Sequence, residues 1–239
     1  MDGLVALEGA LLVERALAAR LELEALYCVP ARRSWAESLA GLETGVTVAS
    51  EAEISRIAGY GFHRGAYALA RRPAESTLAE ALPKGTGAAT VLVLPELGDP
   101  ENLGAAFRNA AALGCSAILL GPAGPDPLCR RALRVSMGSS LRLPWARMKG
   151  PEDLVGLGKR GFGAAACVLD PDAVDLRSWR RPPRLALVLG NEAFGLSGPW
   201  LDACPDRITL PMQGGADSLN LATAAALFLY SLAANAGGP

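Results

Sequence analysis

LALVLGNEAFGLS, residues 185–197, is the stretch that decides the fold. Its first five residues are apolar with no polar alternation, which is typical of a strand buried on both faces of a parallel sheet. Gly190 breaks this strand, and Asn191 and Glu192 place an amide and a carboxylate just beyond its carboxyl end. Ligands of open α/β sheets bind outside the carboxyl ends of the strands, so this loop is a candidate binding site.

A second stretch, residues 207–222, repeats the plan with a short strand, a proline and a loop that contains Gly214 and Gly215. Ser218 lies where this loop becomes a helix, and we expect its side chain to cap that helix. Asn220 begins an otherwise apolar helix, and an amide buried without a partner is destabilising. That cost favours a partner such as Arg108, Glu192 or a substrate.

A third stretch, NLGAAFRNA at residues 102–110, opens an alanine-rich helix expected over residues 103–113. Asn102 at its start is either an N-cap or a functional side chain, since Asn is common at caps. The alanines suit close packing of this helix, so we expect Arg108 to project at an interface or cleft. The alternative for Arg108 is a solvated helix charge.

Alternating strands and helices after residue 88 predict a parallel sheet with helices on both faces. The strands are expected over residues 89–94, 117–120, 141–144, 164–169 and 185–189, and further helices over residues 128–137 and 152–159. Proline, glycine and charge mark residues 73–87 as a linker. We therefore expect an N-terminal domain over residues 1–72 and a larger domain over residues 88–239.

The N-terminal domain reads as a small α/β unit. Helices are expected over residues 6–19, 33–40 and 51–58, and strands over residues 23–29, 46–48 and 65–70. Ser50 precedes two glutamates, Glu51 and Glu53, and is expected to cap the third helix.

Composition excludes several classes of protein. The formal net charge is −1, so any surface for nucleic acid must be a local patch. The five cysteines are scattered without a CxxC pair, which indicates reduced core cysteines of a cytoplasmic protein. A single histidine without clustered ligands argues against a metal site. No signal peptide is evident, and residues 219–234 indicate a buried helix rather than a membrane span.

Taken in chain order and at this spacing, the three stretches resemble the motifs of the SpoU (TrmH-type) RNA ribose methyltransferases, which belong to the knotted SPOUT class. GNEAFGLS, LPMQGGADSLNLA and NLGAAFRNA carry the resemblance, which covers roughly residues 88–235. It implies a trefoil knot in the C-terminal domain, S-adenosylmethionine as cofactor and methyl transfer to a ribose 2′-hydroxyl. It further implies a homodimer packed through helices 218–235 and 102–113, with the first-motif arginine near the partner's cofactor site.

Residue roles follow from the same resemblance. The implied catalytic residues are Arg108, Asn102, Glu192, Ser218 and Asn220, and the implied cofactor-binding residues are Leu169, Gly190, Asn191, Leu210, Met212 and Leu219. The family proposal makes Arg108 the base that takes the 2′-hydroxyl proton. Because a guanidinium is effectively always protonated, we prefer a role in stabilising alkoxide charge and holding the adjacent phosphate, although both roles stay open.

The N-terminal sequences LEGALLVERAL and FHRGAYALARRP are similar to the RNA substrate-binding domain that many family members carry. Arg64, Arg71 and Arg72 are candidates for contacts with RNA phosphates. This extension favours ribosomal RNA, while a tRNA ribose methyltransferase and a catalytically silent RNA-binding relative are the alternatives. A Rossmann-type oxidoreductase is disfavoured, because no G-x-G-x-x-G follows the first strand of the larger domain.

Overall fold

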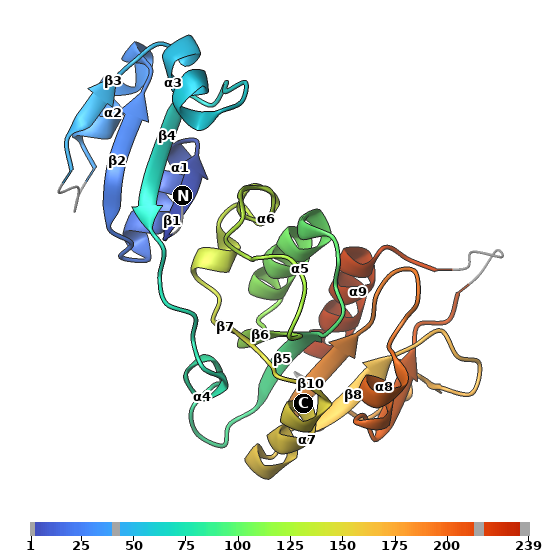
Figure 1. The fold of residues 1–239 in the computed structure, drawn as a ribbon. Coiled ribbons are helices and arrows are strands. Elements are labelled where there is room, and N and C mark those ends of the chain that lie inside the picture. Colours follow the sequence, from blue (N-terminus) through green and yellow to red (C-terminus); the bar gives the residue numbers. More distant parts are fainter. Residues whose placement is uncertain (1–2, 40–43, 213–217, 235–239) are drawn as a thin grey trace.

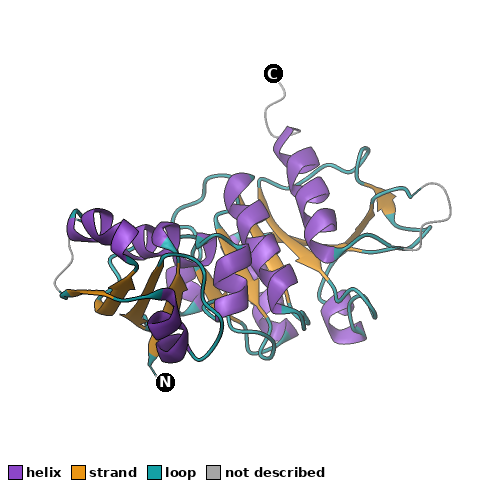
Figure 2. Cartoon of the chain, turned by 90° about the horizontal axis from the view of Figure 1, so that it is seen from above, coloured by secondary structure: helices purple, strands orange, loops and turns teal. Residues whose placement is uncertain are grey.

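Two β-sheets organise the chain (Figures 1 and 2). The first lies within residues 4–71, which we call the N-terminal half of the molecule, and the second lies within residues 89–209. The structure is a computed structural model and describes residues 3–39, 44–212 and 218–234. Gly214 and Gly215 of the predicted glycine-rich loop lie outside these residues, as does the end of the helix expected to reach residue 235. The first sheet has four strands in the order β1-β4-β2-β3, and the second has seven in the order β7-β6-β5-β10-β8-β11-β9.

The small sheet occupies the N-terminal end of the molecule, coloured blue to cyan in Figure 1. One face packs against α1 and α2, and the other packs against α3. Ser50 caps α3 in a capping box with Glu53, as the sequence predicts. The elements are β1 (Leu4–Glu8), α1 (Ala10–Ala18), β2 (Leu23–Cys28), α2 (Arg33–Glu37), β3 (Val46–Val48), α3 (Glu51–Ala58) and β4 (Ala66–Arg71).

The helix predicted over residues 6–19 is wrong at its start. Leu4–Glu8 form the edge strand β1, which pairs antiparallel with β4. Gly9 follows at a φ of 88°, a conformation that glycine adopts without strain, and it separates the strand from α1. Leu7 is buried in the core, and both the two-residue period of a strand and the 3.6-residue period of a helix would place it there. The apolar pattern alone therefore did not distinguish the strand from a first helical turn.

All strand pairs of the large sheet are parallel. Its centre is β10, the strand predicted from residues 185–189, which lies between β5 and β8 and is buried along its whole length. The elements are α4 (Leu78–Ala81), β5 (Ala89–Leu94), α5 (Pro100–Ala112), β6 (Ala117–Leu120), α6 (Arg130–Val135), β7 (Trp145–Arg147), α7 (Pro151–Leu157), β8 (Gly163–Cys167), β9 (Val174–Asp175), β10 (Arg184–Leu189), α8 (Gly198–Asp202), β11 (Asp206–Thr209) and α9 (Leu221–Ala234).

Helices cover both faces of this sheet, as the sequence predicts. Leu92 and Leu94 of β5 point into a core shared with α5, α6 and α9, whereas Val91 and Val93 point into a core shared with α4, α7 and α8. This division follows from the alternation of side chains along a strand. The trefoil knot stays a prediction of the resemblance.

The strand predicted over residues 141–144 is wrong. Ser139–Leu141 form a 3-10 turn that follows Gly138, whose φ is 78°. The edge strand β7 begins only at Trp145 and pairs with β6. The short elements α4, α8 and β9 were not predicted, because segments of two to five residues show no clear hydrophobic period.

The two halves share one apolar cluster. Leu128 and Leu133, from the segment around α6, are buried together with Leu12 and Val13 of α1. Ion pairs flank this cluster: Arg130 of α6 binds the buried Glu8, and Arg72 binds Asp126 at 2.6 Å. We therefore expect the N-terminal half to hold a defined position against the large sheet.

Candidate active site at the carboxyl ends of the strands

Three segments that are distant in sequence meet through one carboxamide. Asn102 near the start of α5 donates a hydrogen bond to Glu192, which lies 90 residues further along the chain. Asn220 donates from Nδ2 to Oδ1 of the same Asn102 at 2.8 Å, although 118 residues separate the two. The three side chains are among those the sequence implied as catalytic, and the structure brings them together.

The helix caps differ from the sequence prediction. Asp99, not Asn102, caps α5, because its carboxylate accepts from the backbone N–H groups of Glu101 and Asn102. Asn220, not Ser218, caps α9: its Oδ1 accepts from the N–H groups of Ala222 at 3.0 Å and Thr223 at 3.3 Å. Asn102 is thereby released from capping, and its whole carboxamide is available to the network.

The partner of Asn220 also differs from expectation. The sequence favoured Arg108, Glu192 or a substrate, on the premise that Asn220 is buried. Asn220 is exposed, and its partner is Asn102.

The loop after β10 is held in a closed turn. The backbone groups of Asn191 and Gly195 exchange two hydrogen bonds, at 2.8 and 2.9 Å. Glu96, just after β5, fixes this turn from outside: its carbonyl oxygen accepts from the Asn191 side chain and its carboxylate from the N–H of Ser197. A Cβ at Gly190 would collide with the backbone of Gly195, so this position requires glycine.

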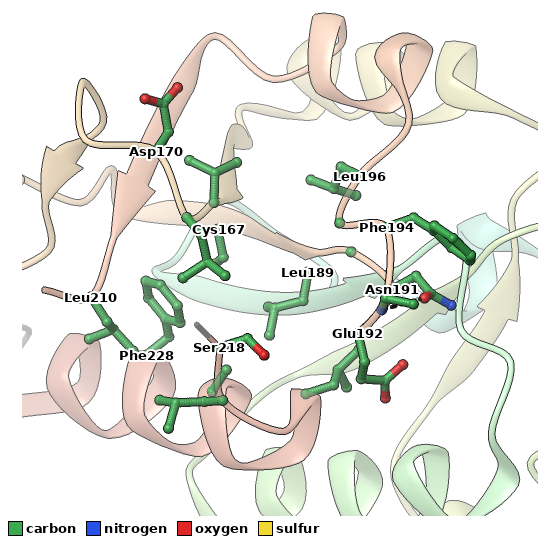
Figure 3. A pocket seen from close by; sticks show the side chains of 18 of the residues that line it. Cys167, Asp170, Leu189, Asn191, Glu192, Phe194, Leu196, Leu210, Ser218 and Phe228 are labelled. Atoms are coloured by element: carbon green, nitrogen blue, oxygen red, sulfur yellow. Dashed lines mark hydrogen bonds between the residues drawn. The ribbon is translucent and has the colours of Figure 1, made fainter. Parts of the chain in front are cut away.

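A cavity of about 570 Å³ opens at these strand ends, and we call it the strand-end cavity (Figure 3). All six predicted cofactor-binding residues line it, as do Glu192 and Ser218. In Figure 3, Leu210 and Phe228 lie on one side of the space and Asn191 and Glu192 on the other. Sequence reasoning missed several of its lining residues, namely Cys167, Asp170, Leu189, Leu196, Arg207 and Phe228.

Some of these missed residues carried a local signal. Asp170 follows the end of β8, as Glu192 follows the end of β10, so position after a strand could have identified it. Phe228 lies within α9 and reaches the cavity only because that helix packs against the sheet, which no local pattern indicates.

The lining combines apolar walls with a few charged and polar groups, which suits a heteroaromatic ring that carries a polar tail. The charged residues of the described lining are Asp170, Glu192 and Arg207, and the two carboxylates can accept hydrogen bonds from a ligand. Burial raises the pKa of the Cys167 thiol well above its ordinary value, so this thiol is neutral and packs as an apolar group. The lining therefore fits S-adenosylmethionine, whose adenine and sulfonium have these properties.

Arg108 does not line the strand-end cavity. It is exposed on α5 and lines a separate cavity together with Arg15 and Arg142. The neighbouring Asn109 points the other way and donates to the carbonyl oxygen of Ala222 at 2.8 Å, which ties α5 to α9. The prediction that Arg108 projects at an interface or cleft is confirmed as to position; its catalytic role stays a prediction.

The three arginines predicted to bind RNA already have carboxylate partners. Arg71 contacts Glu24 at 2.6 Å, and Arg72 contacts Asp126 at the same distance. Arg64 lies 3.9 Å from the buried Glu8. Arg72 is therefore foremost a link between the two halves of the chain, and RNA binding by the three arginines stays a prediction.

Within the described residues, no group of three or more His, Cys, Asp or Glu side chains is arranged to hold a metal ion. The described helices include none that is both long and apolar enough to cross a membrane.

A parallel sheet with helices on both faces and a cavity at its strand ends places the chain in the class of open α/β proteins, whose ligands bind at the carboxyl ends of the strands. The model of the SpoU rRNA methylase family matches residues 89–230. An uncharacterised tRNA/rRNA methyltransferase of Mycobacterium bovis is 41% identical over 95% of this chain and 80% of its own length. The chain belongs to the SpoU rRNA methylase family.

Solved structures agree over nearly the whole chain. The AdoMet-bound rRNA methyltransferase of Sinorhizobium meliloti superposes with a TM-score of 0.84 at 27% identity and covers 99% of this chain and 88% of its own. A structure described as an RNA 2′-O ribose methyltransferase gives a TM-score of 0.81 at 32% identity over 98% of this chain and 89% of its own. The fold is therefore that of the SPOUT methyltransferases, and the matches extend through the N-terminal half.

Proposed function

We propose that this protein is an S-adenosylmethionine-dependent RNA methyltransferase that acts on a ribose 2′-hydroxyl. The observation that carries the proposal is the Asn102–Glu192–Asn220 network beside the strand-end cavity, in a chain of the SpoU family. The similarity to an RNA 2′-O ribose methyltransferase supports the position of methylation. The test is a map of 2′-O-methyl positions on total RNA from cells with and without the gene; identical maps would reject the proposal.

The strand-end cavity is the proposed cofactor site. S-adenosylmethionine supplies a methyl group already activated on its sulfonium, so the transfer requires no metal. Leu210, Met212 and Phe228 form apolar walls for the adenine, and Asp170 and Glu192, which also line the cavity, supply carboxylates for the charged part. Calorimetry with S-adenosylhomocysteine tests this site: we expect saturable binding, and its absence at high ligand concentration would exclude it.

Arg108 acts on the RNA rather than on the cofactor. Its guanidinium holds a phosphate next to the target ribose and stabilises the charge that develops on the 2′-oxygen as its proton leaves. A guanidinium suits this role because it supplies a fixed positive charge and a planar fork of donors, and the role needs no proton transfer by the side chain. Glu192 and Asn220 hold the Asn102 carboxamide, and so keep the start of α5 in place against the loop after β10 and the start of α9.

We also propose that the protein is a homodimer through α5 and α9, which pack against each other. Leu227 and Tyr230 of α9 are 43% and 66% exposed, an apolar surface that a monomer would leave in water. Arg108 lies outside the strand-end cavity of its own chain, and a second copy facing α5 would bring its cavity to this arginine. Light scattering tests the assembly, and a monomeric mass at micromolar concentration would reject it.

The proposed substrate is ribosomal RNA and the proposed compartment is the cytoplasm. The match to an rRNA methyltransferase runs through both halves of the chain, and this supports the assignment. A tRNA target is the alternative, and the methylation map distinguishes the two directly. A catalytically silent relative is disfavoured because Asn102, Arg108, Glu192, Ser218 and Asn220 are all present.

A further inference from the structure

A second cavity, of about 540 Å³, lies between α1, α5 and the segment that follows α6. It shares no lining residue with the strand-end cavity. Its described lining contains three arginines and no carboxylate. The lining residues are Arg15, Arg108, Ala111, Ala112, Ser136, Met137, Ser139, Arg142 and Leu143, and we call this site the arginine cavity.

Both halves of the chain build the arginine cavity. Arg15 comes from α1, and its guanidinium donates to the carbonyl oxygen of Met137. The helix packs closely here, because a Cβ at Gly138 would lie 3.0 Å from Leu12 and 3.2 Å from Arg15. Met137 has a φ of 51°, which is uncommon for a residue other than glycine and is often associated with functional sites. These contacts fix Arg15 against the larger domain.

The charges of the arginine cavity are not balanced within it. Among the described residues, Arg15, Arg108 and Arg142 form no ion pair. Other described arginines, such as Arg131, also lack one, but these three line a single cavity whose described lining contains no carboxylate. Three guanidinium groups gathered around one cavity suit an anion with several oxygens, because the guanidinium fork matches phosphate geometry.

We infer that the arginine cavity binds a backbone phosphate of the RNA substrate, with Arg15 and Arg142 as positioning residues beside Arg108. This inference rests on the proposed function and deepens it. Because Arg15 belongs to the N-terminal half, that half contributes directly to the phosphate site next to the proposed catalytic arginine. RNA that is held by the N-terminal half thereby enters the active site in a fixed register.

The test uses Arg142→Gln in the full-length protein, because Arg142 makes no side-chain hydrogen bond or ion pair among the described residues that the fold could lose. Arg131→Gln is the matched control: Arg131 is also exposed, on α6, but lies outside the cavity lining. The probe is a short fluorescein-labelled single-stranded RNA of mixed sequence, and anisotropy gives its affinity over a series of KCl concentrations.

We expect Arg142→Gln to weaken RNA binding about three- to tenfold and to lower the slope of log affinity against log salt by about 0.7, the value for one lost contact with single-stranded RNA. Arg142→Lys should restore the slope but not the full affinity, since it keeps the charge without the fork. Arg131→Gln should change neither quantity. Equal binding by Arg142→Gln and Arg131→Gln overturns the inference.

The same preparations separate this inference from the proposed function. Methyl transfer to total RNA by the wild type, together with unchanged binding by Arg142→Gln, rejects the phosphate site and leaves the enzyme activity standing. Absence of methyl transfer, together with the expected loss of binding by Arg142→Gln, rejects the activity and supports the phosphate site.

Discussion

Asn220 donates a hydrogen bond from Nδ2 to Oδ1 of Asn102 over 2.8 Å, across 118 residues of sequence. The same Asn220 caps α9 through its Oδ1, and the same Asn102 donates to Glu192. The nitrogen and the oxygen of both side-chain carboxamides therefore all have hydrogen-bond partners. The start of α5, the loop after β10 and the start of α9 are held in one arrangement.

This double use of Asn220 predicts different outcomes for two substitutions. Asn220→Ala removes the cap and the donor, so it should lower the free energy of unfolding by about 1 kcal/mol and also reduce methyl transfer. Asn220→Asp keeps the cap but replaces the donor with an acceptor that faces Asn102. It should leave stability near wild type and lower the rate about tenfold or more. Denaturant unfolding and single-turnover methylation measure the two effects, and equal rates for Asn220→Asp and wild type would contradict the role of the network.

Arg108→Ala should lower the single-turnover rate of methyl transfer by about 10²–10³, since its interaction forms mainly in the transition state. Affinity for S-adenosylhomocysteine should not change, because Arg108 lies outside the strand-end cavity. Arg108→Lys keeps the charge without the fork and should recover little of the rate. A near-normal rate in Arg108→Ala would show that this residue is only a solvated charge on the surface of α5.

If Arg108 serves the cavity of the partner, two inactive variants should complement each other. Arg108→Ala retains an intact strand-end cavity, and Gly190→Ala retains an intact arginine. Random association of the two gives mixed dimers in which one of the two sites is complete, so the mixture should recover about a quarter of the wild-type rate. The measurement is methyl transfer after the two are co-expressed and purified together. If methyl transfer does not recover, Arg108 either serves the cavity of its own chain or has no role in catalysis.

Gly190→Ala should abolish binding of S-adenosylhomocysteine. The added Cβ would collide with the backbone of Gly195, so the turn from Asn191 to Gly195 must move. Overpacking of this kind costs about 1–3 kcal/mol of stability. Gly198→Ala is the control in the same segment, because an added Cβ at Gly198 meets nothing within 4 Å. Calorimetry should show binding by the control alone, and binding by both would exclude the loop from the site.

The ion pair between Arg72 and Asp126 should make stability depend on pH. Burial raises the pKa of Asp126, but hydrogen bonds from Arg72 and the Leu128 N–H outweigh it and hold that pKa below its ordinary value of 3.8. The unfolded chain therefore binds the proton more tightly. The contribution is present above about pH 4 and is lost as the pH falls through the folded pKa.

Both partners are partly exposed, so we expect the contribution to stay below about 1 kcal/mol. Denaturant unfolding of wild type and Asp126→Asn should show a difference near neutral pH that shrinks in acid. Asp172→Asn, which removes an exposed carboxylate without an ion pair among the described residues, should show none. A difference that does not vary with pH would point to the Leu128 N–H rather than to the charge.

Local pattern was sufficient where one segment carried its own signal. The strands β5 and β6 begin and end where the sequence predicts, because continuous apolar runs fit only the interior of a parallel sheet. Ser50 caps α3 as predicted, and the structure adds a reciprocal contact from Glu53, three residues later, that completes a capping box. The six residues predicted to bind the cofactor line one cavity, since the carboxyl ends of parallel strands lie at one edge.

Local pattern failed where two structures satisfy the same period or where a competing residue lay nearby. Leu7 is apolar in a strand and in a helix alike, and only the pairing of β1 with β4 decided between them. Asn220 rather than Ser218 caps α9 because the helix begins only at Leu221, later than the position of Ser218 indicated. Asp99 and Asn102 are both good caps, and the position of the first helical turn selected Asp99.

The sequence by itself determined the α/β class, the order of most elements and the candidate residues for the chemistry, because each depends on residues close together in the chain. Only the tertiary structure decided that Asn102 joins Glu192 to Asn220, and that Arg108 lies apart from the strand-end cavity beside Arg15 and Arg142. These contacts depend on strand order and on how α1 docks against Gly138. Both result from packing between distant segments, which local propensity does not encode.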